Sequence, residues 1–413
     1  MPILLPVDEL SEGMRLAESF MHSGRVMITA GRMLHHGDIC TLRQKYPYAS
    51  VMIGDPILER AADFEDDGHE RTIAAKVQST INDVMSDTAR KLSRRTSLSG
   101  RDFIVLEEAA LDLMNYLAEN PVTAALLIRT MNGGGYLPDH TGAVFYLAMV
   151  LGSTIQTYIA EDRMRRSCCK DLSAQTAMDL RPLGLGAMFM DLGMYALTNL
   201  YGEPDEELTP AVRKQIIEHP LTGADMLPQS FPAAARMIVR THHENLDGTG
   251  YPAKLPADKL HIFAKIIRIC DYYAAATAPS PEHLACSSAC ALWQLQHGPW
   301  RHCYDPLLAR MFSRLIQPFP IGAKLKLSDG RYGVLVRYNR QEVFRPTIII
   351  AFDERGERIP HEQIEPPFCL TDAPHLQIAG FAGEDLKYLY GPDDDRPVRE
   401  VGAFTSVHES MMP

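Results

Sequence analysis

The stretch His-His-Glu-Asn-Leu-Asp-Gly-Thr-Gly-Tyr-Pro, residues 242–252, is unlike an ordinary core segment. Two adjacent imidazoles and an acid precede a turn that is rich in glycine and ends in proline. Neutral imidazole nitrogens suit Fe, Mn and Zn ions, and carboxylates can bridge between such ions. The alternative reading is a helix end capped by a Gly-rich turn. The composition favours a metal site beside a rigid loop.

Helical periodicity dominates around this stretch, from residue 101 to about residue 318. Apolar residues recur there at spacings of three and four, as at Phe103, Leu106, Ala110 and Leu113. Prolines and glycines interrupt the pattern, which predicts a bundle of several helices joined by loops. Residues 59–100 begin as a charged segment and continue with helical spacing. We expect a linker with a connecting helix there, a candidate for homodimer formation.

Both ends of the chain have strand-like patterns instead. Residues 1–58 contain short apolar runs divided by glycines, which predicts a small β-rich module. Residues 319–392 alternate around two turns and predict a second small β module. Residues 393–413 are polar, and we expect a flexible tail. The predicted fold is mainly α, with a helical domain at 101–318 flanked by these two modules.

Composition narrows the function classes. The chain has 413 residues, 46% of them hydrophobic, and a formal net charge of -11, which argues against non-specific nucleic-acid binding. Its start lacks the basic segment of a signal peptide, and the apolar stretch 142–160 contains several polar residues. Eight cysteines at irregular spacings fit a reducing compartment. We therefore expect a cytoplasmic protein without a membrane segment, which can still bind a small anionic ligand.

Residues 242–252 match the pattern HHExxDGxGYP, and the chain therefore resembles the HD-GYP phosphohydrolases. These proteins hydrolyse the bacterial second messenger cyclic di-GMP. The resemblance implies an HD-type helical bundle and cyclic di-GMP, or a related nucleotide, as ligand. It also implies a loop that walls the site and offers a contact surface for a protein partner. That loop comprises Asp247, Gly248, Gly250, Tyr251 and Pro252.

The resemblance also implies a ligand set for a divalent metal, Fe or Mn. The matching positions, in chain order, are His140, Asp191, His219, His242, His243 and Asp271. Asp191 would bridge two cations, and Asp191, His242 and His243 would be the catalytic residues. If His242 and His243 lie on a helix, their side chains point about 100° apart. In that case they would bind different metals, or one of them would support the other.

Three departures from the family pattern weaken this site. Met190 occupies the position of the histidine in the His-Asp dyad, and a thioether is a poor ligand for hard Fe or Mn ions. Met194 replaces a lysine that would contact substrate phosphate. Residues 280–283 read Ser-Pro-Glu-His where the family carries phosphate-binding arginines. We expect a degenerate centre that holds one ion or none.

A looser group of potential metal ligands follows the main motif. It comprises Cys286, Cys290, His297, His302 and Cys303. The spacing matches no established zinc pattern, and cysteines four residues apart on a helix are usually core residues. Core packing is the favoured interpretation.

Three hypotheses follow. The first is a cyclic di-GMP signalling protein of HD-GYP type with weak or no turnover, acting through ligand binding or partner docking. The second is an active metal-dependent phosphodiesterase that releases the linear dinucleotide or GMP. The third is protein–protein interaction through the loop alone.

Overall fold

The computed structural model describes residues 2–22, 25–47, 49–65, 68–93, 98–121, 136–166, 172–197, 210–278 and 286–390. Two compact units are present. The terminal unit comprises the described residues of 2–71, 287–293 and 316–390, and the helical unit comprises the described residues of 72–286 and 294–315. The predicted tail at 393–413 and the segment 280–283 lie outside the described residues.

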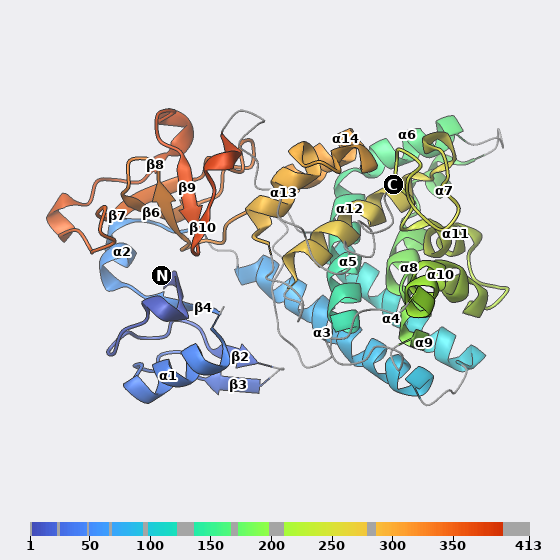
Figure 1. The fold of residues 1–413 in the computed structure, drawn as a ribbon, viewed down its shortest axis with the longest axis horizontal. Helices are drawn as coiled ribbons and strands as arrows, with labels where there is room; N and C mark the ends of the chain where they lie inside the picture. Colours follow the sequence, from blue (N-terminus) through green and yellow to red (C-terminus); the bar gives the residue numbers. More distant parts are fainter. Residues whose placement is uncertain are drawn as a thin grey trace. The chain divides into compact units, whose positions relative to one another are not determined.

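The helical part of the chain confirms the mainly α prediction (Figure 1). Its helices, in chain order, are α3 (Gly68–Ser93), α4 (Gly100–Glu119), α5 (Tyr136–Thr154), α6 (Gln156–Arg166), α7 (Ala174–Met178), α8 (Arg181–Phe189), α9 (Leu192–Leu197), α10 (Pro210–Met226), α11 (Ala233–Thr241), α12 (Ile262–Thr277), α13 (Ser288–His297) and α14 (Pro306–Leu315). Short 3-10 turns, η2 (Ala257–Lys259) and η3 (Arg301–Cys303), lie between the later helices.

The apolar residues of helix α3 recur every four residues and form one buried face. Each of these side chains is at most 1% exposed: Ile73, Val77, Ile81 and Met85. Helix α4 begins with a capping box, in which Ser99 and Asp102 satisfy each other's backbone N–H groups. Lys91 of α3 also donates to Asp102, with 2.7 Å between Nζ and Oδ1. One carboxylate therefore caps α4 and ties it to α3.

Helices α5 and α12 pack together at the centre of the unit, and most of their residues are buried. Helices α9 and α10 approach each other closely at Gly193. A Cβ atom there would lie 2.2 Å from the carbonyl oxygen of His219 and 2.9 Å from the backbone nitrogen of Gly223. Only glycine permits this backbone contact, and it places α10 beside the chain segment that carries Asp191.

The terminal unit combines the two ends of the chain. From the N-terminus come β1 (Pro2–Pro6), η1 (Val7–Glu9), β2 (Phe20–His22), β3 (Arg25–Ile28), α1 (His36–Lys45), β4 (Ser50–Gly54) and α2 (Pro56–Ala61). From the C-terminal part come β5 (Lys324–Leu327), β6 (Tyr332–Arg337), β7 (Thr347–Phe352), η4 (His361–Gln363), β8 (Phe368–Cys369), η5 (Leu370–Asp372), β9 (Ile378–Phe381), β10 (Glu384–Asp385) and η6 (Lys387–Leu389).

The small β sheets expected at both ends are confirmed. Strands β1 and β4 pair antiparallel, β2 pairs with β3, and six strands form a sheet of order β10-β9-β5-β6-β7-β8. The two ends share one hydrophobic core, because Ile3 and Leu5 belong to the same cluster as Val334 and Ile349. The backbone N–H of Leu4 also donates to the carbonyl of Gly322. Two modules that are distant in sequence therefore fold as one unit.

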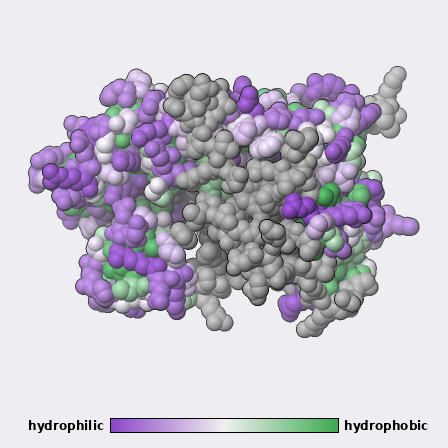
Figure 2. Space-filling model, in the orientation of Figure 1, coloured by the Kyte–Doolittle hydropathy of each residue, from purple (hydrophilic) through white to green (hydrophobic). Residues whose placement is uncertain are grey.

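The surface of the terminal unit is mainly hydrophilic on the face shown in Figure 2, with a smaller hydrophobic area in its lower part. Across the described residues, no single helix combines the length and apolarity needed to cross a membrane. Helices α5 and α6 reach the required length and apolarity only when they are taken together, and the chain bends by 82° between them.

Candidate metal centre

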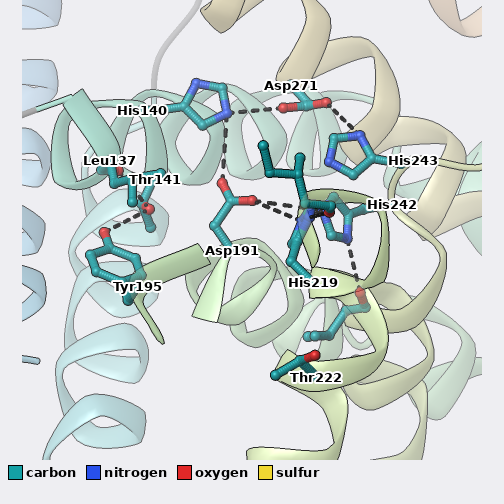
Figure 3. A network of polar contacts seen from close by, with 12 residues as sticks. Leu137, His140, Thr141, Asp191, Tyr195, His219, Thr222, His242, His243 and Asp271 are labelled. Carbon is teal, nitrogen blue, oxygen red and sulfur yellow. Dashed lines mark hydrogen bonds and ion pairs between the residues drawn. The ribbon is translucent and has the colours of Figure 1, made fainter. Parts of the chain in front are cut away.

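The six predicted ligands converge in the helical unit (Figure 3). They come from α5, from the turn after α8, from α10, from the end of α11 and from α12. Each is at most 6% exposed; in chain order they are His140, Asp191, His219, His242, His243 and Asp271. So many buried ionisable groups require partners or a cation, because charge is costly to bury alone.

Two imidazoles present lone pairs to each other. Nδ1 of His219 lies 2.6 Å from the carbonyl oxygen of Ile216, and Nδ1 of His242 lies 2.9 Å from that of Val239. A carbonyl can only accept, so both Nδ1 atoms carry the proton and donate it. In the neutral rings both Nε2 atoms are then acceptors, yet they lie 3.1 Å apart. A cation between them would satisfy both.

The carboxylate of Asp191 faces the same point. Its Oδ1 lies 3.4 Å from Nε2 of His219 and 3.8 Å from Nε2 of His242. Burial by itself would raise the pKa of the Asp191 carboxyl, but contact with His219 and the nearby His140 lower it to about 2. Burial and the neighbouring His219 lower the pKa of His242 to about 4. An ionised carboxylate and a neutral imidazole are the states in which these groups bind metals.

His140 and Asp271 are engaged with each other at the edge of this group. Nε2 of His140 lies 2.9 Å from Oδ1 of Asp271, and 3.8 Å from Oδ2 of Asp191. Burial would lower the pKa of His140, but the hydrogen bond to Asp271 and the charges of both carboxylates raise it. Nε2 of His140 therefore donates a hydrogen bond to the carboxylate of Asp271.

Four residues make up the group that fits a cation: Asp191, His219, His242 and His243, with one donor atom from each within 4.8 Å of all the others. A carboxylate with imidazoles suits divalent transition-metal ions. Both adjacent histidines belong to this one group, because α11 ends at Thr241 and His242 caps it. His243 also faces Asp271, with its Nδ1 3.5 Å from Oδ2 of that carboxylate.

The loop after the histidines is held by the acid beside them. Glu244 accepts hydrogen bonds from the backbone N–H groups of Ala253 and Leu255, at 2.7 and 2.9 Å. The Tyr251 ring stacks on His243, with ring centroids 4.7 Å apart. Gly250 is required because a Cβ atom would lie 2.3 Å from the backbone nitrogen of Asn245. Glu244 therefore shapes the loop that walls the site.

The two methionines at which the sequence departs from the expected pattern are both buried, Met190 fully and Met194 with 1% exposed. Met194 packs in a small apolar cluster with Ile216, against which Leu137 and Leu197 lie. A lysine at this position would place its ammonium group in that apolar cluster. Both side chains are thus part of the hydrophobic packing of the helical unit.

Sequence reasoning missed Arg268, a buried cation one helical turn before Asp271. Its Nε donates to Oδ1 of Asn245 at 3.0 Å, and its Nη1 lies 3.7 Å from Oδ2 of Asp271. The guanidinium also lies over the ring of Tyr304, 5.1 Å from the centroid. The spacing of three residues between Arg268 and Asp271 on a predicted helix was the available signal.

The sequence of this chain is similar to those of known proteins. Residues 147–308 match the family model described as HD domain. A cyclic di-GMP phosphodiesterase of Pseudomonas aeruginosa is 28% identical over 189 residues, which cover 45% of this chain and 45% of the relative. A cyclic di-GMP phosphodiesterase of Vibrio cholerae is 33% identical over 123 residues, covering 28% of this chain and 24% of the relative.

A third relative is the cyclic di-GMP phosphodiesterase response regulator RpfG of Xanthomonas campestris, 27% identical over 137 residues, which cover 32% of this chain and 36% of the relative. The chain thus spans less than half the length of each of these relatives. Among solved structures, an HDG"Y"P protein from Bdellovibrio bacteriovorus covers 76% of this chain and 98% of its own, with a TM-score of 0.39 and 14% identity.

The match of residues 147–308 identifies an HD domain within the helical part of the chain. The motif at 242–252 and the three relatives named as cyclic di-GMP phosphodiesterases support the HD-GYP family for this domain.

Proposed function

We propose that this chain is a cyclic di-GMP signalling protein of HD-GYP type that binds its ligand with weak or no turnover. One observation carries the proposal: Asp191, His219, His242 and His243 bring one possible ligand atom each within 4.8 Å of one another, while position 190 beside them is a fully buried methionine. With methionine at position 190, the second ion of a two-ion centre lacks an imidazole ligand.

The four-residue group would hold Fe or Mn. A bound ion supplies Lewis acidity to a phosphoryl oxygen and lowers the pKa of a bound water. Asp191, His219 and His242 would fix the ion through the lone pairs described above. Two-ion hydrolysis also clamps the leaving oxygen, and this chain's side chains at Met190 and Met194 contribute neither a ligand nor a charge to that step.

The nucleotide ligand is inferred from the relatives, each of which is called a cyclic di-GMP phosphodiesterase. Docking of a protein partner through the loop is the third hypothesis. The Tyr251 ring is used in stacking on His243, so a partner would first meet the exposed Ala253 and Lys254.

The deciding experiment uses the full chain, purified without oxygen and supplied with ferrous or manganous ion. Binding of cyclic di-GMP is measured by calorimetry, and products are separated by chromatography. The Asp191→Ala variant gives the background level of product formation. The Asp258→Ala variant, which changes an exposed aspartate, is the matched control. Bound metal and bound nucleotide without product is the expected result.

Linear dinucleotide or GMP above the Asp191→Ala background would overturn the proposal in favour of an active phosphodiesterase. Bound metal without any nucleotide binding would also overturn it, and would leave protein docking as the remaining hypothesis.

A further inference from the structure

A second group of metal-binding residue types lies on the outer side of the loop. Nε2 of His302 lies 3.2 Å from Oδ2 of Asp247, and Sγ of Cys303 lies 3.8 Å from the same oxygen. One donor atom from each of the three residues lies within 4.8 Å of the others. Asp247 belongs to the Gly-rich turn, whereas His302 and Cys303 form the end of η3.

The surrounding contacts hold this geometry in place. The backbone N–H of Leu246 donates to the carbonyl oxygen of Cys303 at 2.8 Å, which joins the two segments directly. Oδ1 of Asp247 accepts from the backbone N–H and the hydroxyl of Thr249, at 3.0 and 2.7 Å. The carboxylate is thereby oriented so that Oδ2 faces His302 and Cys303.

Helix α12 holds the other segment. Nζ of Lys265 lies 3.2 Å from Oδ2 of Asp305, and Arg268 lies over the Tyr304 ring. The position of η3 is therefore set by two cationic side chains of a buried helix. These contacts place Asp247, His302 and Cys303 relative to one another.

The spacings suit a tetrahedral cation. With Zn–N and Zn–O bonds of about 2.0–2.1 Å and a Zn–S bond of about 2.3 Å, tetrahedral edges are about 3.3 Å for N to O and about 3.5 Å for S to O. The corresponding distances here are 3.2 and 3.8 Å. Small side-chain adjustments would bring all three atoms to bonding distance of one ion.

A catalytic cysteine would require a different spatial arrangement of the thiol, the imidazole and the carboxylate. In a Cys-His-Asp triad the imidazole stands between the thiol and the carboxylate. Here the carboxylate oxygen of Asp247 contacts both of the others. The three side chains are therefore not ordered as a catalytic triad, and their three possible ligand atoms lie within 4.8 Å of one another.

We propose that Asp247, His302 and Cys303 hold a zinc-class divalent cation that fastens the loop to η3. The side chain of His302 is 53% exposed and that of Asp247 20%, so the ion is reached from solvent and its fourth position is open to water. The site differs from the buried centre in containing a thiolate. Because the loop carries Tyr251 onto His243, occupancy of this site stabilises the wall of that centre.

Cobalt(II) is the probe, because a thiolate bound to it gives a charge-transfer band in the near ultraviolet that imidazoles and carboxylates do not give. The metal-free full chain is titrated with Co²⁺ and compared with Cys303→Ser. The matched control is Cys369→Ser, which changes a partly buried cysteine of the terminal unit. We expect the band in the unchanged protein and in Cys369→Ser, and its loss in Cys303→Ser.

Two further variants secure the result. Asp191→Ala removes a ligand of the buried centre and should keep the band. His302→Ala changes a side chain that is 53% exposed, and it should weaken Co²⁺ binding at this site by at least about tenfold. Co²⁺ binding without a band in the unchanged protein, or a band that survives Cys303→Ser, would overturn the proposal.

Discussion

Nε2 of His140 lies 2.9 Å from Oδ1 of Asp271, a contact between residues 131 positions apart in the chain. It joins α5 to α12 across the centre of the helical unit. Close to this pair, Asp191, His219, His242 and His243 bring one possible ligand atom each within 4.8 Å of one another. The pair therefore lies beside the four-residue group and links two central helices of the unit.

Removing Asp191 should have a different effect from neutralising Asp271. Asp191→Ala deletes the carboxylate that faces His219 and His242, so we expect loss of bound iron or manganese and a lower Tm. Asp271→Asn keeps an acceptor for His140, so we expect it to retain at least half of the bound metal. Metal per chain is measured by mass spectrometry, with the exposed His361→Ala as control. Equal metal content in both aspartate variants would contradict the one-ion arrangement.

Restoring the dyad should increase metal binding. In Met190→His an imidazole enters beside Asp191, at a fully buried position, and supplies the missing ligand type. We expect a second equivalent of metal and hydrolysis of cyclic di-GMP at least about tenfold above the Asp191→Ala background, which equals about 1.4 kcal/mol of barrier.

Met194→Lys is the comparison for that variant. Its ammonium group would enter the apolar cluster with Ile216 and Leu137, and the cost of desolvation should lower Tm without raising turnover. If Met190→His binds a second ion but gives no product, the missing phosphate contacts, and not the ligand set, limit the activity.

The close contact at Gly193 should be essential for the centre. In Gly193→Ala the added methyl group would lie 2.2 Å from the carbonyl oxygen of His219, so α9 and α10 must separate. We expect a loss of about 3 kcal/mol in the free energy of unfolding, together with weaker metal binding. Gly37→Ala is the control, because a Cβ atom there has nothing within 4 Å. Denaturant unfolding gives the comparison, and similar losses in both variants would argue against the helix contact.

The connection between α3 and α4 should depend on pH. Hydrogen bonds from Lys91 and Ser99 hold the pKa of Asp102 well below its usual range. A folded-state pKa below the unfolded value, about 3.9 for aspartate, stabilises the fold above that value. The contribution is lost as the pH falls through the folded-state pKa.

Asp102→Asn should therefore lower Tm at pH 7, and the difference from the unchanged protein should shrink below about pH 4. Asp112→Asn, an exposed change on the same helix, serves as control. A difference in Tm that stays constant between pH 7 and pH 3 would show that the charge of Asp102 is not responsible.

Local sequence determined much of this protein. The apolar spacing at Ile73, Val77 and Ile81 specifies a helix, because burial of one face requires a period near 3.6 residues. The run at 242–252 identified the family, because its histidines and glycines are consecutive in the chain and have local structural roles. Strand patterns at both ends were also readable, since alternation requires only neighbouring residues.

Tertiary structure decided how distant residues combine. It placed Ile3 and Val334 in one core, bonded His140 to Asp271, brought Arg268 to Asn245, and set Asp247 against His302 and Cys303. None of these pairs has a signal in sequence spacing, because the path of the chain between them, and not the local pattern, sets their distance. For the same reason His242 and His243 share one group: α11 ends at Thr241, and the turn that follows directs both rings to Asp191.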